Sequence, residues 1–161
     1  MTTRRNLLIA SAVAVLGGWQ LWRSSAEAGN EKVFEITKSD EEWRELLTRS
    51  QYQVLRKHGT ERPYSHPLND NKRAGTYHCA GCDLPLYSSK TKYDSRTGWP
   101  SFWQALDGSV GTKTDYLIGY ARTEVHCRRC GGHIGHVFED GPQPTGLRYC
   151  MNGVAMTFHP A

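Results

Sequence analysis

Two pairs of cysteines with the same spacing constrain the fold of this chain more than any other feature. Cys79 and Cys82 form one CxxC pair, Cys127 and Cys130 form the other, and 44 residues separate them. Each pair places two thiolates on a tight turn, and two such turns supply the four ligands of a closed tetrahedral zinc site. Because the separating segment is longer than in a compact zinc ribbon, we expect one structural zinc ion to join two hairpins that are distant in the sequence.

Two redox-active disulfides are the alternative interpretation, which an oxidising compartment would favour. A redox CxxC usually lies at the start of a helix in a βαβ unit, whereas both pairs here adjoin strand-like sequence. The zinc interpretation leaves Cys150 as the only free thiol among five cysteines. His78 and His126 each precede a cysteine ligand, but neighbouring side chains of a strand point to opposite faces. We therefore expect these histidines to pack or to donate hydrogen bonds and not to bind the same metal.

Residues 1–28 are predicted to be a removable export signal. Arg4 and Arg5 precede an uncharged apolar stretch that reaches Trp22, and a small-x-small sequence typical of a signal-peptidase site ends at Ala28. The arginine pair resembles a twin-arginine signal, which predicts export to a bacterial periplasm. An uncleaved membrane anchor is the alternative, but the apolar stretch is shorter than the roughly 20 residues of a spanning helix. After cleavage we expect no stable membrane association.

The rest of the chain has the length of one domain and almost no net charge. The signal contains three arginines and one glutamate, so the remaining 133 residues carry 17 basic and 15 acidic side chains, a net charge of +2. Nucleic-acid binders normally have a basic stripe, so no nucleic-acid partner is expected. We interpret residues 29–38 as a tether and residues 39–161 as one catalytic domain, which we expect to be monomeric.

The pattern of this domain predicts a mainly β fold with an N-terminal helix. Ser39 and Glu42 have the spacing of a capping box, and an apolar stripe of Trp43, Leu46 and Leu47 follows, with a weaker helical pattern towards His58. Beyond it, aromatic and β-branched segments alternate with turn residues, which is typical of antiparallel strands. The predicted strands are 75–79, 84–87, 116–120, 122–127, 134–138, 147–151 and 154–158.

The surroundings of Cys150 carry the first indication of chemistry. If residues 147–151 form a strand that continues to Asn152, then Arg148, Cys150 and Asn152 share one face. An arginine favours the thiolate, the nucleophilic form of cysteine, and an asparagine offers both a donor and an acceptor. A lone cysteine is, however, more often a small buried apolar residue. The choice between a reactive and a structural Cys150 therefore depends on the residues that other segments offer.

Two other segments offer such neighbours. His133 and His136 lie close in sequence to Asp140, and they could be a proton donor with its orienting carboxylate. Residues 98–103 place three aromatic side chains, Trp99 among them, around a proline, and these could form an apolar wall. Each segment also has a purely structural interpretation, because histidine pairs in glycine-rich turns and clusters of Trp and Phe are common in cores.

Taken together, these short runs resemble the B-type methionine sulfoxide reductases. The resemblance extends from about residue 58 to residue 158, in order and with the family's spacing. It is carried by Lys72-Arg73, Tyr77-His78-Cys79, Lys92-Tyr93-Asp94-Ser95, Gly98-Trp99-Pro100-Ser101-Phe102, Gly135-His136-Val137-Phe138, Asp140-Gly141-Pro142, Pro144-Thr145-Gly146 and Arg148-Tyr149-Cys150-Met151-Asn152.

The resemblance implies a fold of two antiparallel sheets with N-terminal helices and a four-cysteine zinc site. It also implies reduction of the R epimer of methionine sulfoxide, since each enzyme type acts on one epimer. It makes Cys150 the nucleophile and places Trp99 and Phe138 against the substrate methyl group. The remaining residues that it places around Cys150 are His133, His136, Asp140, Arg148 and Asn152, and either histidine is expected to donate the proton.

One departure from the family affects how the enzyme would be recycled. Many relatives have a second, resolving cysteine where this chain has Thr97. With four cysteines bound to zinc, a sulfenic acid on Cys150 must be reduced by an external thiol, either a thioredoxin-like protein or a small thiol. The substrate could be protein-bound or free. A zinc-stapled binding module with a buried Cys150 and a thiol peroxidase remain alternatives.

Overall fold

The computed structural model of the protein describes residues 34–161. The predicted export signal and the first part of the predicted tether lie outside the described residues. Within residues 34–161, no helix has the length and apolar character needed to cross a membrane. Short helices and strands follow one another in the order α1 (Asp40–Leu46), α2 (Arg49–Leu55), β1 (Gly75–Cys79), β2 (Pro85–Ser88), β3 (Lys92–Tyr93), β4 (Ser101–Phe102), β5 (Val110–Asp115), β6 (Arg122–Cys127), β7 (His133–Phe138), β8 (Arg148–Met151) and β9 (Met156–Pro160).

The predicted helix start is confirmed, but the helical segment breaks in the middle. Ser39 and Glu42 form the expected capping box, in which the Glu42 amide donates to Ser39 Oγ at 3.2 Å and the Ser39 amide donates to the Glu42 carboxylate at 2.7 Å. Leu47 then adopts an extended conformation, and Thr48 caps a second helix in a capping box with Gln51. The prediction of one helix continuing towards His58 is therefore wrong. The sequence contains a second helix start signal, the capping box of Thr48 and Gln51. Because the residue before this signal is extended, the first helix ends there.

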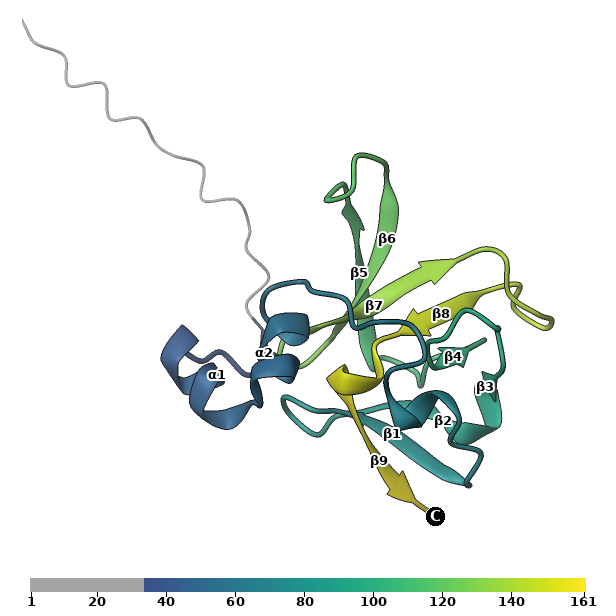
Figure 1. The fold of residues 1–161 in the computed structure, drawn as a ribbon, viewed down its shortest axis with the longest axis horizontal. Helices are drawn as coiled ribbons and strands as arrows, with labels where there is room; N and C mark the ends of the chain where they lie inside the picture. Colours follow the sequence, from purple (N-terminus) through teal and green to yellow (C-terminus); the bar gives the residue numbers. More distant parts are fainter. Residues whose placement is uncertain (1–33) are drawn as a thin grey trace, which may run out of the picture. The chain divides into compact units, whose positions relative to one another are not determined.

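All strands pair in antiparallel fashion in two sheets, as predicted (Figure 1). The smaller sheet has the order β2-β1-β9, and the larger has the order β3-β4-β8-β7-β6-β5. In the larger sheet β8, which carries Cys150, lies between β4 and β7, so that Cys150 faces Ser101 on one side and His136 on the other. This register brings three segments that are distant in sequence to one place.

The predicted strand at 116–120 is wrong, because these residues form the turn between β5 and β6. Its Tyr, Leu and Ile side chains have high strand propensity, but that propensity mainly reflects packing in a sheet, and here the pairing ends at Asp115 and Arg122. The preceding strand β5 was not predicted, because four of its six residues are Gly, Thr or Lys and lack an apolar alternation. The short strands β3 and β4 were also missed. The strand predicted at residues 154–158 instead begins at Met156, because residues 153–155 form a 3-10 turn.

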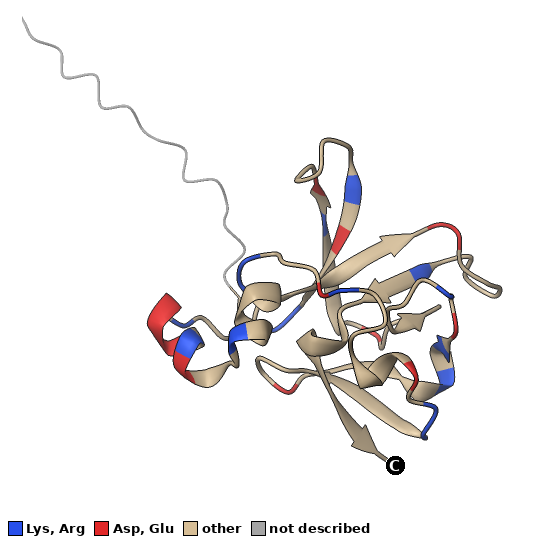
Figure 2. Cartoon of the chain, in the orientation of Figure 1, with Lys and Arg blue, Asp and Glu red and all other residues tan. Residues whose placement is uncertain are grey.

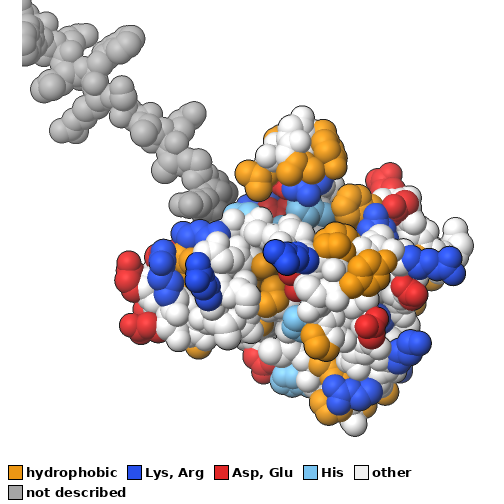
Figure 3. All heavy atoms as spheres, in the orientation of Figure 1, with side chains coloured by type: hydrophobic (Ala, Val, Ile, Leu, Met, Phe, Trp, Pro, Cys, Tyr) orange, Lys and Arg blue, Asp and Glu red, His pale blue; other side chains and the backbone are white. Residues whose placement is uncertain are grey.

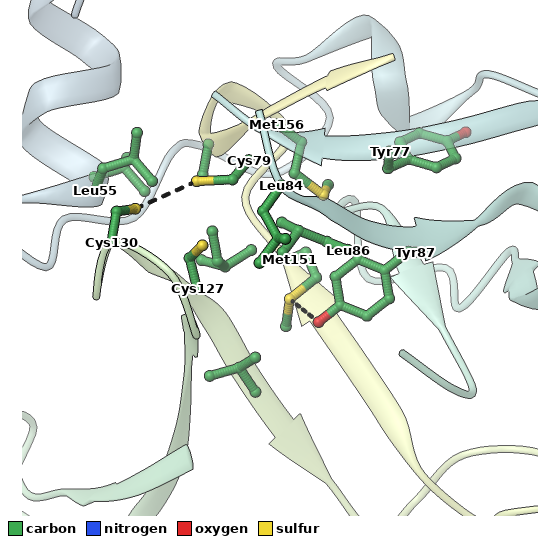
Figure 4. Packing of buried hydrophobic residues seen from close by; sticks show 14 of the residues in the cluster. Leu55, Tyr77, Cys79, Leu84, Leu86, Tyr87, Cys127, Cys130, Met151 and Met156 are labelled. Carbon is green, nitrogen blue, oxygen red and sulfur yellow. Dashed lines mark hydrogen bonds between the residues drawn. The ribbon is translucent and has the colours of Figure 1, made fainter. Parts of the chain in front are cut away.

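Aromatic side chains at the centre of the core fix the position of β4 and β8. Phe102 stacks on Tyr87 with ring centroids 4.4 Å apart and meets Tyr77 edge-on at 4.9 Å. The Tyr87 hydroxyl donates to the sulfur of Met151 at 3.0 Å (Figure 4). All four side chains are fully buried, so the residues that alternate with them along β4 and β8, including Cys150, face away from this core.

Candidate active site and metal centre

The two CxxC pairs form matching turns that bring four sulfur atoms together. In the first, the Cys82 and Asp83 amides donate to the Cys79 carbonyl, and in the second the Gly131 amide donates to the Cys127 carbonyl. Asp83 and Gly131, which directly follow the second cysteine of each pair, both have left-handed backbones, with φ of 56° and 68°. A residue of this kind reverses the chain sharply, so both sulfurs of each pair point inward.

The sulfur positions fit a single tetrahedral metal ion. Sγ of Cys79 lies 3.7 Å from Sγ of Cys130, Sγ of Cys82 lies 3.5 Å from Sγ of Cys127, and all four sulfurs lie within 4.8 Å of one another. A tetrahedron with metal–sulfur bonds of about 2.3 Å has edges of about 3.8 Å, whereas disulfide sulfurs are about 2.05 Å apart. The cluster therefore has the geometry of a four-thiolate metal site, and it joins the β1–β2 and β6–β7 turns.

The C-terminal end of α2 packs beside this cluster. Leu55 of α2 lies beside the cysteines in Figure 4, and the Arg56 guanidinium donates to the Cys130 carbonyl at 3.0 Å. His78 Nδ1 donates to Asp83 Oδ1 at 3.1 Å, and His78 stacks on His159. Neither His78 nor His126 belongs to the cysteine cluster. This agrees with the expectation that these histidines pack or hydrogen-bond.

A separate cavity of about 130 Å³ contains Cys150. Trp99 and Phe138 provide apolar surface, and His136 and Asn152 provide polar groups, as the resemblance implies. The complete lining is Thr60, Trp99, Arg122, Gly135, His136, Phe138, Cys150 and Asn152. Gly135 is required here, because a side chain at this position would lie 2.2 Å from the Cys150 carbonyl oxygen.

The Cys150 thiol is half-buried, and burial is the main influence on its acidity. Burial raises its pKa above the ordinary value, while the Thr97 hydroxyl, 3.8 Å from the sulfur, and the Arg148 guanidinium act in the opposite direction. Arg148 therefore favours the thiolate as expected from the sequence, but it does not outweigh desolvation. Burial therefore favours the protonated thiol.

His136 faces Cys150 across the β7–β8 pair and is held from its other side by Asp115. The His136 Nε2 atom and Asp115 Oδ2 are 2.8 Å apart, and Asp115 also pairs with Arg122 at 2.6 Å. A hydrogen bond from the Leu117 amide, the contact with His136 and the pairing with Arg122 lower the pKa of Asp115 to about 2. Burial lowers the pKa of His136 more than Asp115 raises it, which favours the neutral imidazole.

His133 contacts His136 and is held by a different carboxylate, that of Glu124. The two imidazole rings meet edge-on with centroids 5.3 Å apart, and His133 is only 2% exposed. The buried carboxylate of Glu124 contacts His133 Nδ1 at 2.8 Å, His58 Nδ1 at 3.2 Å and Lys113 Nζ at 3.1 Å. Burial raises the pKa of Glu124, but the hydrogen bonds from His133, His58 and Lys113 outweigh it and lower the pKa below its ordinary value.

The prediction that Asp140 orients a histidine is wrong. Asp140 instead binds Arg148 through two hydrogen bonds of 2.8 Å each, and the Arg148 guanidinium lies over the Phe138 ring, 4.4 Å from its centroid. Asp140 is thus placed to orient the guanidinium that favours the Cys150 thiolate. The carboxylates that hold the histidines come from β5 and β6, which the sequence pattern did not connect to this site.

A loop before β1 lines the cavity through Thr60 and holds two of the other lining side chains through Glu61. The Trp99 indole donates to the Glu61 carbonyl at 3.1 Å, and the Glu61 amide donates to Asn152 Oδ1 at 3.0 Å. The Glu61 carboxylate accepts from the amides of Gly153 and Val154. Sequence reasoning missed Glu61, Asp115, Arg122 and Glu124, because only the folded chain brings them to the cavity lining or to the histidines.

Comparison with known proteins assigns the family. A family model described as the SelR domain matches residues 47–160. Relatives named peptide methionine sulfoxide reductase MsrB include a protein from Pseudomonas putida, 56% identical over 78% of this chain and 95% of its own length. Another, from Agrobacterium fabrum, is 52% identical over 78% of this chain and 93% of its own length, and one from Methanosarcina barkeri is 53% identical over 76% and 87%. The chain belongs to the SelR-domain family of MsrB oxidoreductases.

Proposed function

We propose that this protein reduces the R epimer of methionine sulfoxide, in proteins or as the free amino acid, with Cys150 as the nucleophile. The observation that carries the proposal is the single cavity in which Cys150, His136 and the Trp99–Phe138 surface lie together. A sulfoxide combines an electrophilic sulfur, a strongly accepting oxygen and an apolar methyl group. The cavity offers a thiol, a proton carrier and an aromatic wall for these three parts.

The protonation states of the cavity suggest the order of the steps. Burial favours the protonated thiol and the neutral imidazole of His136, so His136 accepts the thiol proton as Cys150 attacks the sulfoxide sulfur. The imidazolium, which Asp115 stabilises, then returns this proton to the sulfoxide oxygen. The S–S bond formed by the attack and the S–O bond of the substrate then break as the hydroxyl group passes to the Cys150 sulfur. Methionine leaves and a sulfenic acid remains, so atoms and protons balance. His133, which is absent from the cavity lining, holds His136 in position in this proposal.

The sulfenic acid is then reduced by an external thiol. All four cysteines other than Cys150 lie in the metal-type cluster, and Thr97 occupies the position of the resolving cysteine in many relatives. Because Thr97 Oγ1 lies 3.8 Å from the Cys150 sulfur, a cysteine introduced at position 97 is close enough to test this step. The Thr97→Cys variant should form a disulfide with Cys150 after one turnover, whereas the wild-type protein should retain a sulfenic acid.

The decisive experiment compares oxidants and variants. Wild-type protein should reduce methyl sulfoxides with a dithiol, prefer the R epimer and reduce hydrogen peroxide poorly. Without reductant, one equivalent of sulfoxide should leave a sulfenic acid that dimedone traps. Cys150→Ser should abolish turnover and retain the metal. An inactive wild-type protein would favour a binding module, and faster turnover of peroxide would favour a peroxidase.

We further propose that the four-cysteine cluster binds structural zinc and that the protein is exported. Tetrahedral thiolate sites suit zinc, and the ion would hold the two turns together without contacting substrate. Export rests on the sequence of residues 1–28 alone. Replacing Arg4 and Arg5 by lysines should retain the precursor in the cytoplasm, and export that depends on the general secretory route would contradict the twin-arginine assignment.

A further inference from the structure

The turn between β5 and β6 exposes an unusual amount of apolar surface. Among residues 34–161, six large apolar side chains are exposed, and four of these belong to residues 116–120, which we call the apolar turn. Tyr116 is 68% exposed, Leu117 71%, Ile118 51% and Tyr120 61%. Figure 3 shows apolar side chains gathered on the projecting hairpin, and Figure 2 shows no charged residue at its tip. Contiguous exposed apolar patches of this kind mark interaction sites.

Hydrogen bonds hold the apolar turn in its exposed conformation. The Leu117 amide donates to Asp115 Oδ1 at 2.7 Å, and the Gly119 amide donates to the Tyr116 carbonyl at 3.0 Å. Gly119 has a left-handed φ of 87° and tightens the turn. The ion pair between Asp115 and Arg122 closes the hairpin directly below. The side chains are therefore displayed on a folded turn, where a partner can bind them without first ordering the chain.

The apolar turn lies between two residues of the catalytic site. Arg122, two positions after the turn, lines the cavity, and Asp115, directly before the turn, holds His136, so a residue on each side of the turn belongs to the site. The cavity volume of about 130 Å³ is below the roughly 300–1,000 Å³ of typical ligand pockets. It can hold one side chain, so the backbone and neighbouring residues of a polypeptide substrate must lie on the surrounding surface.

We infer that the apolar turn docks apolar residues that flank an oxidised methionine in an unfolded polypeptide. The inference rests on the proposed function and makes the turn the element that selects polypeptides over free methionine sulfoxide. Methionine is mostly buried in folded proteins, so unfolding exposes it together with other apolar residues. Free methionine sulfoxide instead brings an ammonium and a carboxylate, which tyrosine, leucine and isoleucine side chains do not pair. Binding remote from the reacting sulfur lowers KM and leaves kcat unchanged.

The test compares substrates in a double variant, Leu117→Ser with Ile118→Ser. The substrates are a peptide with methionine sulfoxide between leucines, the same peptide with serines instead, and the free amino acid. We expect KM for the leucine peptide to rise about tenfold or more, because burial of a leucine or isoleucine is worth roughly 1.5–3 kcal/mol. Values of kcat, and KM for the other two substrates, should stay unchanged. Leu46→Ser, at a 55% exposed leucine of α1, is the matched control and should change nothing.

Three outcomes would overturn the inference. The first is an unchanged KM for the leucine peptide, and the second is an equal rise in KM for the free amino acid. The third is binding of wild-type protein to anionic phospholipid vesicles that the double variant loses while its peptide KM is unchanged, because this would assign the turn to a membrane surface. If wild-type protein reduces no methyl sulfoxide, the proposed function fails separately. Fluorescence anisotropy with the labelled leucine peptide then decides: weaker binding by the double variant supports docking, and equal binding refutes it.

Discussion

Replacement of Glu124 by glutamine should reveal how much a buried carboxylate and its hydrogen bonds contribute to this fold. Glu124 is 2% exposed, and its carboxylate contacts His133, His58 and Lys113 at 2.8–3.2 Å. Glutamine has nearly the same shape but carries no charge, and its amide nitrogen cannot accept a hydrogen bond. At least one of the three partners therefore loses its acceptor, and the buried His133 cannot turn to water instead.

The expected loss of stability is about 3 kcal/mol. Leaving a buried donor without its acceptor costs roughly 1–3 kcal/mol, and more where a charged group is involved. The side chains of His58 and Lys113 are 46% and 56% exposed and can recover hydration, whereas His133 is 2% exposed and cannot, which places the loss at the upper end. For a domain of this size each kcal/mol lowers the melting temperature by roughly 3–5 °C, so a decrease of about 10 °C is expected.

Urea unfolding of wild-type protein and Glu124→Gln between pH 7 and pH 3.5 measures the effect. The folded-state pKa of Glu124 lies below its unfolded value of about 4.3. Its contribution is therefore complete above the unfolded pKa and is lost as the pH falls further. The stability difference should be constant near neutral pH and should narrow below about pH 4. Lys113→Met, at an exposed partner, should cost less than about 1 kcal/mol. A loss below 1 kcal/mol for Glu124→Gln at pH 7, or a difference that widens in acid, would refute this reasoning.

Three further substitutions test the metal cluster and the cavity. Cys82→Ser should yield metal-poor, unfolded protein by circular dichroism and metal analysis, because structural zinc contributes about 10–16 kcal/mol, more than most domains have in total; a stable, metal-free variant would contradict this. His136→Ala should lower kcat by roughly 10²–10⁴-fold in a dithiol-coupled assay, and unchanged turnover would remove it from proton transfer. Arg148→Met should raise the pKa of Cys150 further and slow its alkylation by iodoacetamide at pH 8, and faster alkylation would show that Arg148 does not favour the thiolate.

Short local motifs in the sequence predicted much of the fold and of the candidate site. The spacing of the CxxC pairs predicted the four-cysteine cluster, because two ligands on one tight turn depend only on nearby residues. The capping box at Ser39 predicted the first helix start for the same reason. The motifs around Cys150 indicated the family and two antiparallel sheets, and His136, Trp99 and Phe138 do line the cavity with the cysteine.

Tertiary structure decided the features that depend on pairing and burial. Residues 116–120 have the composition of a strand, but strand pairing ends before them and they form the exposed turn. Asp140 lies only four residues after His136 in the sequence, whereas contacts between strands bring Asp115 to His136 and Glu124 to His133. The nearby Arg148 in the sequence predicted a lowered pKa for the Cys150 thiol, but burial raises the pKa of this thiol. Desolvation and cross-strand contacts are set by residues far apart in the chain, so no local pattern contains them.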